Sequence, residues 1–170
     1  MNLSTLHAKL ENQRLSIFML SRAFENKIIC LGIIVFWWLF WLFNVLDKFI
    51  GGQTYLWAGK DRFAQLVQYF ALIGIENEAI VFVSLFVTTI LEVFALVFAT
   101  FALVYCVVGN KRIAHGALYL TILTSLTIFS VFAIGDQVFG DRFELLEHTL
   151  YWIAFVLSWF LYTKYEQEMA

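Results

Sequence analysis

The chain has 170 residues, of which 62% are apolar, 19% are aromatic and only 14% are charged. Average soluble proteins are roughly 45–50% apolar and about 25% charged, and a small domain cannot hide such an apolar excess from water. Lysine and arginine total 11 against 13 acidic residues, so there is no basic surplus to neutralise phosphates. Composition therefore excludes a soluble enzyme, a disordered chain and a nucleic-acid-binding protein, and indicates an integral membrane protein.

Residues 1–27 are predicted to form an amphipathic interfacial arm. Basic residues alternate there with apolar side chains that recur at near-helical spacing. The apolar residues are Leu3, Leu6, Leu10, Ile17, Leu20 and Phe24. Two roles stay open for the arm. It is either an anchor on anionic lipid or a docking helix for a partner subunit.

Four continuously apolar runs follow, and each is long enough to cross a bilayer as a helix. They cover residues 28–46, 79–108, 113–134 and 145–163. Continuous runs exclude a barrel, in which apolar and polar residues alternate. We predict an all-α integral membrane four-helix bundle over residues 28–163, followed by a short cytoplasmic tail.

The segment between the first two runs is predicted to contain a short surface helix. Gly51 and Gly52 interrupt the chain after the first span. Within residues 61–75, apolar side chains then recur on one helical face: Phe63, Leu66, Val67, Phe70 and Ile73. This helix would lie on the non-cytoplasmic surface or cap the bundle there.

The distribution of charge predicts the orientation. Basic residues gather in the N-terminal arm, at Lys111 and Arg112 between the second and third spans, and at Lys164 in the tail. The opposite side is rich in acidic residues. By the positive-inside rule, we expect both termini on the cytoplasmic side of an inner cell membrane.

The usual sequence signals of a catalytic or metal site are missing. Cys30 and Cys106 form no C-x-x-C pair, so we interpret them as structural thiols. Nucleotide loops and hydrolase or metalloprotease motifs are absent. Leu145 stands where the Glu-x-x-His pattern of bundle di-iron sites would need glutamate, and we predict no metal site.

Glu92 lies near the middle of the second span, where a charged carboxylate costs roughly 2.5–3.5 kcal/mol. It must therefore face the bundle interior or be protonated. Thr88 shares its face, and the third span offers hydroxyl partners for it: Thr121, Thr124, Ser125 and Thr127. Two roles stay open: a carboxyl that handles protons or orients a ligand, and a protonated acid that pins spans two and three together.

A second polar cluster precedes the fourth span: Asp136, Asp141, Arg142, Glu144, Glu147 and His148. Glu144 and His148 share a helix face. The open roles for this face are a salt-bridged rim at the membrane surface, contact with protons or a quinone head group, and, as the weakest, metal binding. Arg142 would pair with Asp141, with Glu144 or with a partner protein, and Lys48 would reach the cluster from the first span. The candidate catalytic residues are therefore Glu92, Glu144 and His148.

Aromatic residues are unusually dense in the first span. Trp37 and Trp41 share one face of this helix, while other rings point elsewhere. These aromatic residues serve either as lipid-facing bulk and packing or as a surface for another subunit, a pigment or a quinone ring. Trp37 and Trp41 are therefore candidate cofactor-binding residues. The small-xxx-small packing signature is nearly absent, since glycine is rare inside the spans and occurs mainly as Gly32.

Four short stretches resemble the DoxX-like membrane proteins, a superfamily with four spans and both termini inside. Residues 44–49 (NVLDKF) match the place where the family's first span ends in a Gly-x-x-Lys-Phe-like motif, and Glu92 matches a glutamate of its second span. Residues 109–114 and 141–148 are similar in place to its basic loop and to the polar segment before its last span. The resemblance covers residues 36–162.

The chain also departs from the family pattern. Asn44 stands where glycine is common, no glycine follows Glu92, and the arm and the aromatic first span are additions. Members have been linked to thiosulfate–quinone oxidoreduction, to redox-stress membrane complexes and to accessory roles. The resemblance therefore implies the fold more than one activity.

The predicted function is that of a small DoxX-like subunit in the lipid bilayer, accessory or structural in a larger membrane redox complex. Its partners would be other membrane subunits or further copies of itself. The alternative is a quinone-linked oxidoreductase subunit that uses a buried carboxyl for proton transfer, with quinone as its cofactor. A small transporter is a weaker alternative, because the spans lack the Gly/Pro breaks that form midplane sites.

Overall fold

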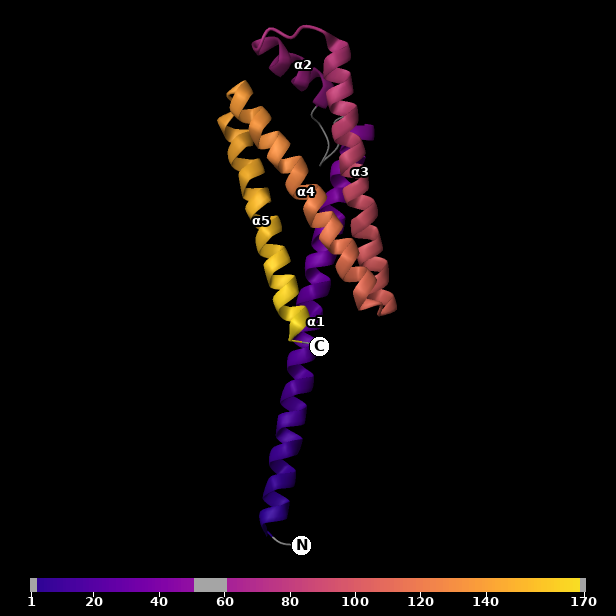
Figure 1. Ribbon diagram of the computed structural model, residues 1–170, viewed down its shortest axis with the longest axis vertical. Helices are drawn as coiled ribbons and strands as arrows, with labels where there is room; N and C mark the ends of the chain where they lie inside the picture. Colours follow the sequence, from indigo (N-terminus) through magenta and orange to yellow (C-terminus); the bar gives the residue numbers. More distant parts are fainter. Residues whose placement is uncertain (1–2, 51–60, 169–170) are drawn as a thin grey trace.

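The computed structural model describes the backbone of residues 3–50 and 61–168, and their side chains from residue 19 onward except residue 21. Its first helix, α1 (Leu3–Ile50), is 48 residues long. Figure 1 shows α1 leaving the bundle as one continuous helix toward the N-terminus. The predicted arm and first span therefore join without a break, since no proline interrupts them. That the arm lies on a membrane surface stays a prediction.

Four further helices follow α1: α2 (Arg62–Leu72), α3 (Glu78–Val108), α4 (Lys111–Phe139) and α5 (Arg142–Gln167). Short polar side chains accept hydrogen bonds from backbone N–H groups in the first turn of each: Asp61, Asn77, Asn110 and Asp141. Gly109 and Gly140 end α3 and α4 in the left-handed conformation, with φ of 87° and 78°.

Within the described residues, four helices are long and apolar enough to cross a membrane: Arg22–Ile50, Glu78–Val108, Lys111–Phe139 and Arg142–Gln167. The prediction of an all-α bundle with four spans is confirmed. Most of the helices extend beyond the predicted apolar runs. Their bounds are set by polar capping residues and glycines, and not by the first and last apolar residues. The predicted surface helix is confirmed as α2.

The four long helices pack in a ring in the order α1, α3, α4, α5, which places α3 and α5 at opposite corners. In Figure 1, α4 crosses the bundle from the end of α3 to the start of α5. The short helix α2 packs on α3 and α4 at the end of the bundle opposite to the termini.

Alanines let α3 lie close to its neighbours. Ala95, Ala99 and Ala102 lie on one face of α3 and are at most 1% exposed, and Ala114 of α4 is buried as well. Helices with small residues at the contact approach closely and gain van der Waals contact, which favours association in a membrane. Close packing of small residues in this bundle therefore depends on alanine, and Gly32 is exposed.

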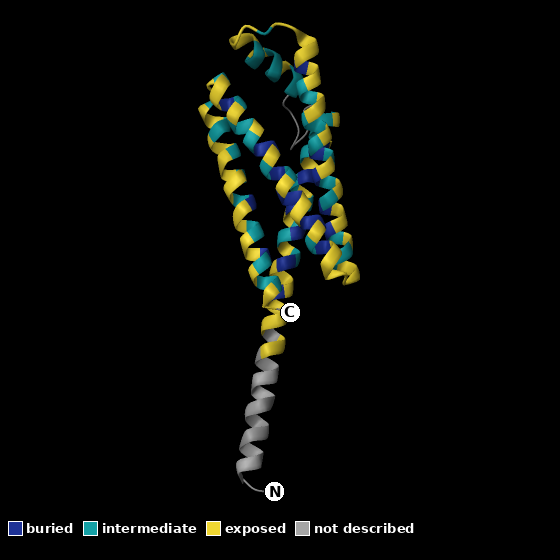
Figure 2. Cartoon of the chain, viewed as in Figure 1, coloured by how far each residue is buried: buried dark blue, intermediate teal, exposed yellow. Residues whose placement is uncertain are grey.

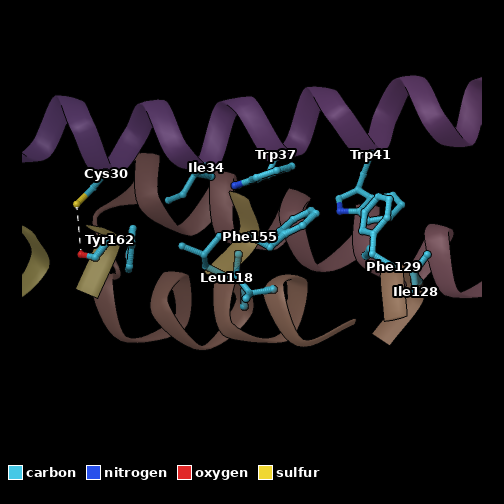
Figure 3. Packing of buried hydrophobic residues seen from close by; sticks show 13 residues of the cluster. Cys30, Ile34, Trp37, Trp41, Leu118, Ile128, Phe129, Phe155 and Tyr162 are labelled. Atoms are coloured by element: carbon cyan, nitrogen blue, oxygen red, sulfur yellow. Dashed lines mark hydrogen bonds between the residues drawn. The ribbon is translucent and has the colours of Figure 1, made fainter. Parts of the chain in front are cut away.

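The core beside α1 is aromatic. Figure 3 shows Ile34, Trp37 and Trp41 pointing from α1 into the bundle, and the ring of Trp37 stacks on Phe155 with 3.6 Å between centroids. The indole N–H of Trp41 donates to the hydroxyl of Ser125 at 2.9 Å. Buried residues gather on the inner sides of the helices, and large apolar side chains cover the outside (Figure 2). This is the pattern of a bundle whose outer surface contacts lipid.

Candidate functional site

A cavity of about 570 Å³ lies inside the bundle beneath α2. It forms where the helices spread apart, and side chains from all five helices line it. Its volume is in the range of pockets that bind small molecules. One part of its wall is aromatic, and the rest carries several charged and polar side chains.

The aromatic wall comes from α1, α4 and α5. The ring centroids of Phe40 and Tyr151 are 5.1 Å apart, those of Phe129 and Tyr151 are 5.3 Å apart, and those of Trp41 and Phe129 are 5.9 Å apart. All four residues line the cavity. Such rings offer a broad apolar surface on which a planar ligand can stack.

Lys48 and Glu92 form an ion pair at the cavity wall. Nζ of Lys48 lies 3.3 Å from Oε1 of Glu92, and the two side chains are 12% and 2% exposed. The lysine belongs to the last turn of α1, so its side chain reaches back along the helix into the bundle. Oε2 of Glu92 is buried without a hydrogen-bond partner among the described residues. Burial of a polar atom without a hydrogen-bond partner costs free energy, so Oε2 of Glu92 is a candidate contact for a ligand.

Asp136 and His148 form a second acid–base pair at the same cavity. Oδ2 of Asp136 in α4 lies 2.6 Å from Nδ1 of His148 in α5. The ring of His148 also packs against Phe129 and Phe132, with centroids 5.6 Å and 4.9 Å away. Carboxylate and rings together fix the orientation of the imidazole.

Helix α2 is held over the cavity by polar contacts. Tyr69 donates to Asp141 at 2.6 Å, and Gln65 donates to Glu144 at 2.8 Å. Arg62 contacts Asp47 of α1 at 3.4 Å. Burial and the hydrogen bond to Asp141 raise the pKa of Tyr69 to about 12, so its phenol stays a proton donor near neutral pH.

The structure brings all three candidate catalytic residues, Glu92, Glu144 and His148, to the wall of this one cavity. The two candidate cofactor-binding residues lie in different places. Trp41 lines the cavity, whereas Trp37 lies deeper in the core against Phe155, and its indole N–H is buried without a partner among the described residues.

Several partners differ from those predicted. Glu92 pairs with Lys48, while the hydroxyls of Thr121 and Ser125 donate to carbonyls of their own helix. Lys48 therefore contacts the second span instead of the acidic cluster. Arg142, expected to pair within that cluster, donates to Gln137 at 2.8 Å.

Sequence reasoning did not pair Asp136 with His148, although a signal was present. Antiparallel helices joined by a tight turn place residues at similar distances from the turn beside each other, and Gly140 marks that turn. The same rule fits His115 and Glu166, which pair at the other end of α4 and α5.

The end of the bundle near the C-terminus offers fewer candidate functional groups than the cavity beneath α2. The thiol of Cys30 is buried and contacts the carbonyl of Tyr162, and Cys106 is a second free thiol. Among the described residues, no group of three or more His, Cys, Asp or Glu side chains could hold a metal ion. The chemistry that the structure offers is therefore concentrated beneath α2.

Fold and site together define a multi-pass helical membrane protein with a polar cavity inside its bundle. Comparison of the chain with protein-family models, curated protein sequences and solved structures finds no match. The function is therefore argued from the cavity itself.

Proposed function

We propose that this chain is a small integral membrane subunit whose cavity holds the head group of a lipid-soluble quinone. One observation carries the proposal: an aromatic wall and two acid–base pairs, Lys48–Glu92 and Asp136–His148, line one cavity inside a membrane bundle. A quinone head is a planar ring with oxygen atoms at opposite edges. It needs a surface for stacking and hydrogen-bonding groups on two sides, and this cavity offers both.

The tail of such a ligand would need an apolar outlet toward the lipid. A second hollow of about 580 Å³ lies between α1 and α3 on the outer side, lined in part by the exposed side chains Phe82, Phe86 and Ile90. Lys48 and Arg62 border both this hollow and the cavity. The hollow supports the proposal because it adjoins the cavity and is apolar along α3.

Binding of a decyl-tailed benzoquinone to the purified protein tests this proposal. Gly135 lines the cavity, and a Cβ there would meet only Phe139 within 4 Å, at 3.5 Å, so the leucine of Gly135→Leu is expected to occupy part of the cavity. Gly116→Leu is the matched control on the same helix, where an added Cβ meets nothing within 4 Å. Tryptophan fluorescence should report saturable binding to the wild type and to Gly116→Leu.

Gly135→Leu is expected to weaken this binding by about tenfold or more, because its side chain occupies the space of the ring. Equal affinity in the two leucine variants would place the ligand outside the cavity and contradict the proposal.

Membership of the DoxX-like family is part of the proposal, and the contacts support it. Residues 44–49 and Glu92, which carry two of the resembling motifs, meet in the Lys48–Glu92 pair. Residues 141–148, a third resembling stretch, contribute Glu144 and His148 to the same cavity. Three stretches that are distant in the sequence therefore converge on one site.

We further propose a place in a larger membrane redox complex, with both termini on the cytoplasmic side of the inner membrane. The support is the projecting part of α1 (Figure 1), where Met19, Leu20 and Phe24 are each at least 66% exposed. Purification from native membranes in mild detergent should yield further subunits in a fixed ratio. A chain that migrates alone would contradict the place in a complex and leave the quinone site standing.

A further inference from the structure

Two hydrogen-bond acceptors line the cavity from opposite corners of the bundle. Glu92 belongs to α3 and His148 to α5, and the ring order of the helices places α1 and α4 between them. Each acceptor is held by a neighbour on an adjacent helix, Glu92 by Lys48 of α1 and His148 by Asp136 of α4. The cavity therefore has an acceptor on each of two sides, with the aromatic wall beside them.

The first acceptor is Oε2 of Glu92. Lys48 occupies the other oxygen of this carboxylate, Oε1, at 3.3 Å. Oε2 is buried and has no hydrogen-bond partner among residues 19–50 and 61–168, apart from residue 21. When it is ionised beside the ammonium group, the carboxylate can only accept hydrogen bonds, so Oε2 then requires a donor.

The second acceptor is Nε2 of His148. The carboxylate of Asp136 lies 2.6 Å from Nδ1 and accepts its hydrogen bond, so the proton of a singly protonated ring lies on Nδ1. Nε2 then presents its lone pair. In the described part of the chain, Nε2 takes part in no hydrogen bond.

We propose that the cavity recognises the reduced form of its ligand, a quinol, whose two hydroxyl groups donate to Oε2 of Glu92 and to Nε2 of His148. This inference rests on the proposed quinone site. The oxidised ring carries carbonyl oxygens, which accept hydrogen bonds, so they can pair with a donor such as Lys48 but with neither of these two acceptors. Binding of the quinone would leave Oε2 of Glu92 buried without a donor and would place a carbonyl oxygen against the lone pair of Nε2, and that difference selects the quinol.

The test compares a decyl-tailed hydroquinone with the corresponding benzoquinone on the full-length purified protein without oxygen. The two molecules share ring and tail and differ only in the hydroxyl hydrogens. The wild type is expected to bind the hydroquinone about tenfold or more tightly. Intrinsic tryptophan fluorescence gives both dissociation constants, with Gly135→Leu as the variant whose cavity is filled.

Two conservative variants remove one acceptor each. In Glu92→Gln, the amide oxygen is expected to take the place of Oε1 beside Lys48, and the NH₂ group the place of Oε2. A hydrogen-bond acceptor at the cavity is then replaced by a donor. In Asp136→Asn, the amide donates to Nδ1 of His148, and the ring proton moves to Nε2. Each variant is expected to reduce the preference for hydroquinone by about tenfold while quinone affinity is maintained or rises.

Maintained quinone affinity distinguishes a loss of hydroquinone recognition from damage to the fold, because a damaged fold would weaken the binding of both ligands. Equal affinity of the wild type for the two forms would overturn this inference and leave the quinone site standing. Variants that weaken both ligands alike would also overturn it. If neither ligand binds the wild type, the proposed function fails together with the inference.

Discussion

Replacing Lys48 by Met is expected to lower the free energy of unfolding by about 3 kcal/mol. The substitution keeps the apolar stem and removes the ammonium, which leaves the carboxylate of Glu92 buried without its counter-charge. Glu92→Leu should cost less, about 1–2 kcal/mol, because the long side chain of Lys48 can turn toward the nearby end of α1. Titration with a denaturing detergent, followed by circular dichroism, measures both values.

The double variant Lys48→Met/Glu92→Leu separates the ion pair from other effects. A buried pair replaced by apolar residues is often neutral for stability, so the double variant should recover most of the loss of Lys48→Met. Strictly additive losses would contradict the view that these two groups stabilise one another.

Asp141→Ala is expected to release α2 from the bundle and to fray the start of α5, with a combined loss of about 2–3 kcal/mol. The carboxylate accepts from Tyr69 at 2.6 Å and from the backbone N–H groups of Phe143 and Glu144. Hydrogen–deuterium exchange should therefore become faster across α2. Asn77→Ala is the control, because Asn77 caps α3 through the N–H of Ala79 without an equivalent bond to α2.

The hydrogen bond from Tyr69 to Asp141 also predicts how docking of α2 depends on pH. The pKa of Tyr69 is raised from 10.0 to about 12 in the folded protein, so the phenol keeps its proton longer there than in the unfolded chain. The stabilisation is complete below pH 10 and is lost as the pH rises through about 12. Protection of α2, corrected for the intrinsic exchange rate, should stay constant from pH 6 to 9. A fall within that range would mean that another group controls docking.

The fold could be predicted from local signals. Each apolar run has the length of a membrane-crossing helix, and residues 61–75 carry a helical face, which became α2. What the apolar pattern could not reveal is where the helices lie close. That depends on Ala95, Ala99 and Ala102, which look unremarkable in an apolar run and matter only because they share the face that packs in the core.

The candidate site was only partly predictable. Glu92 attracts attention because a charge in a span needs an interior partner, and Glu144 and His148 because they share a face. The pairing of Lys48 with Glu92 depends on how α1 and α3 lie side by side. Those helices are joined by a long connection that contains α2, so the sequence carries no register between them.

The quinone content of the protein purified from native membranes tests the central claim most directly. Extraction with organic solvent and mass spectrometry should find close to one lipid-soluble quinone for each wild-type chain and for each Gly116→Leu chain. Gly135→Leu, whose leucine fills the cavity beneath α2, should lose it. A wild-type protein without quinone, or equal quinone in both leucine variants, would contradict the account.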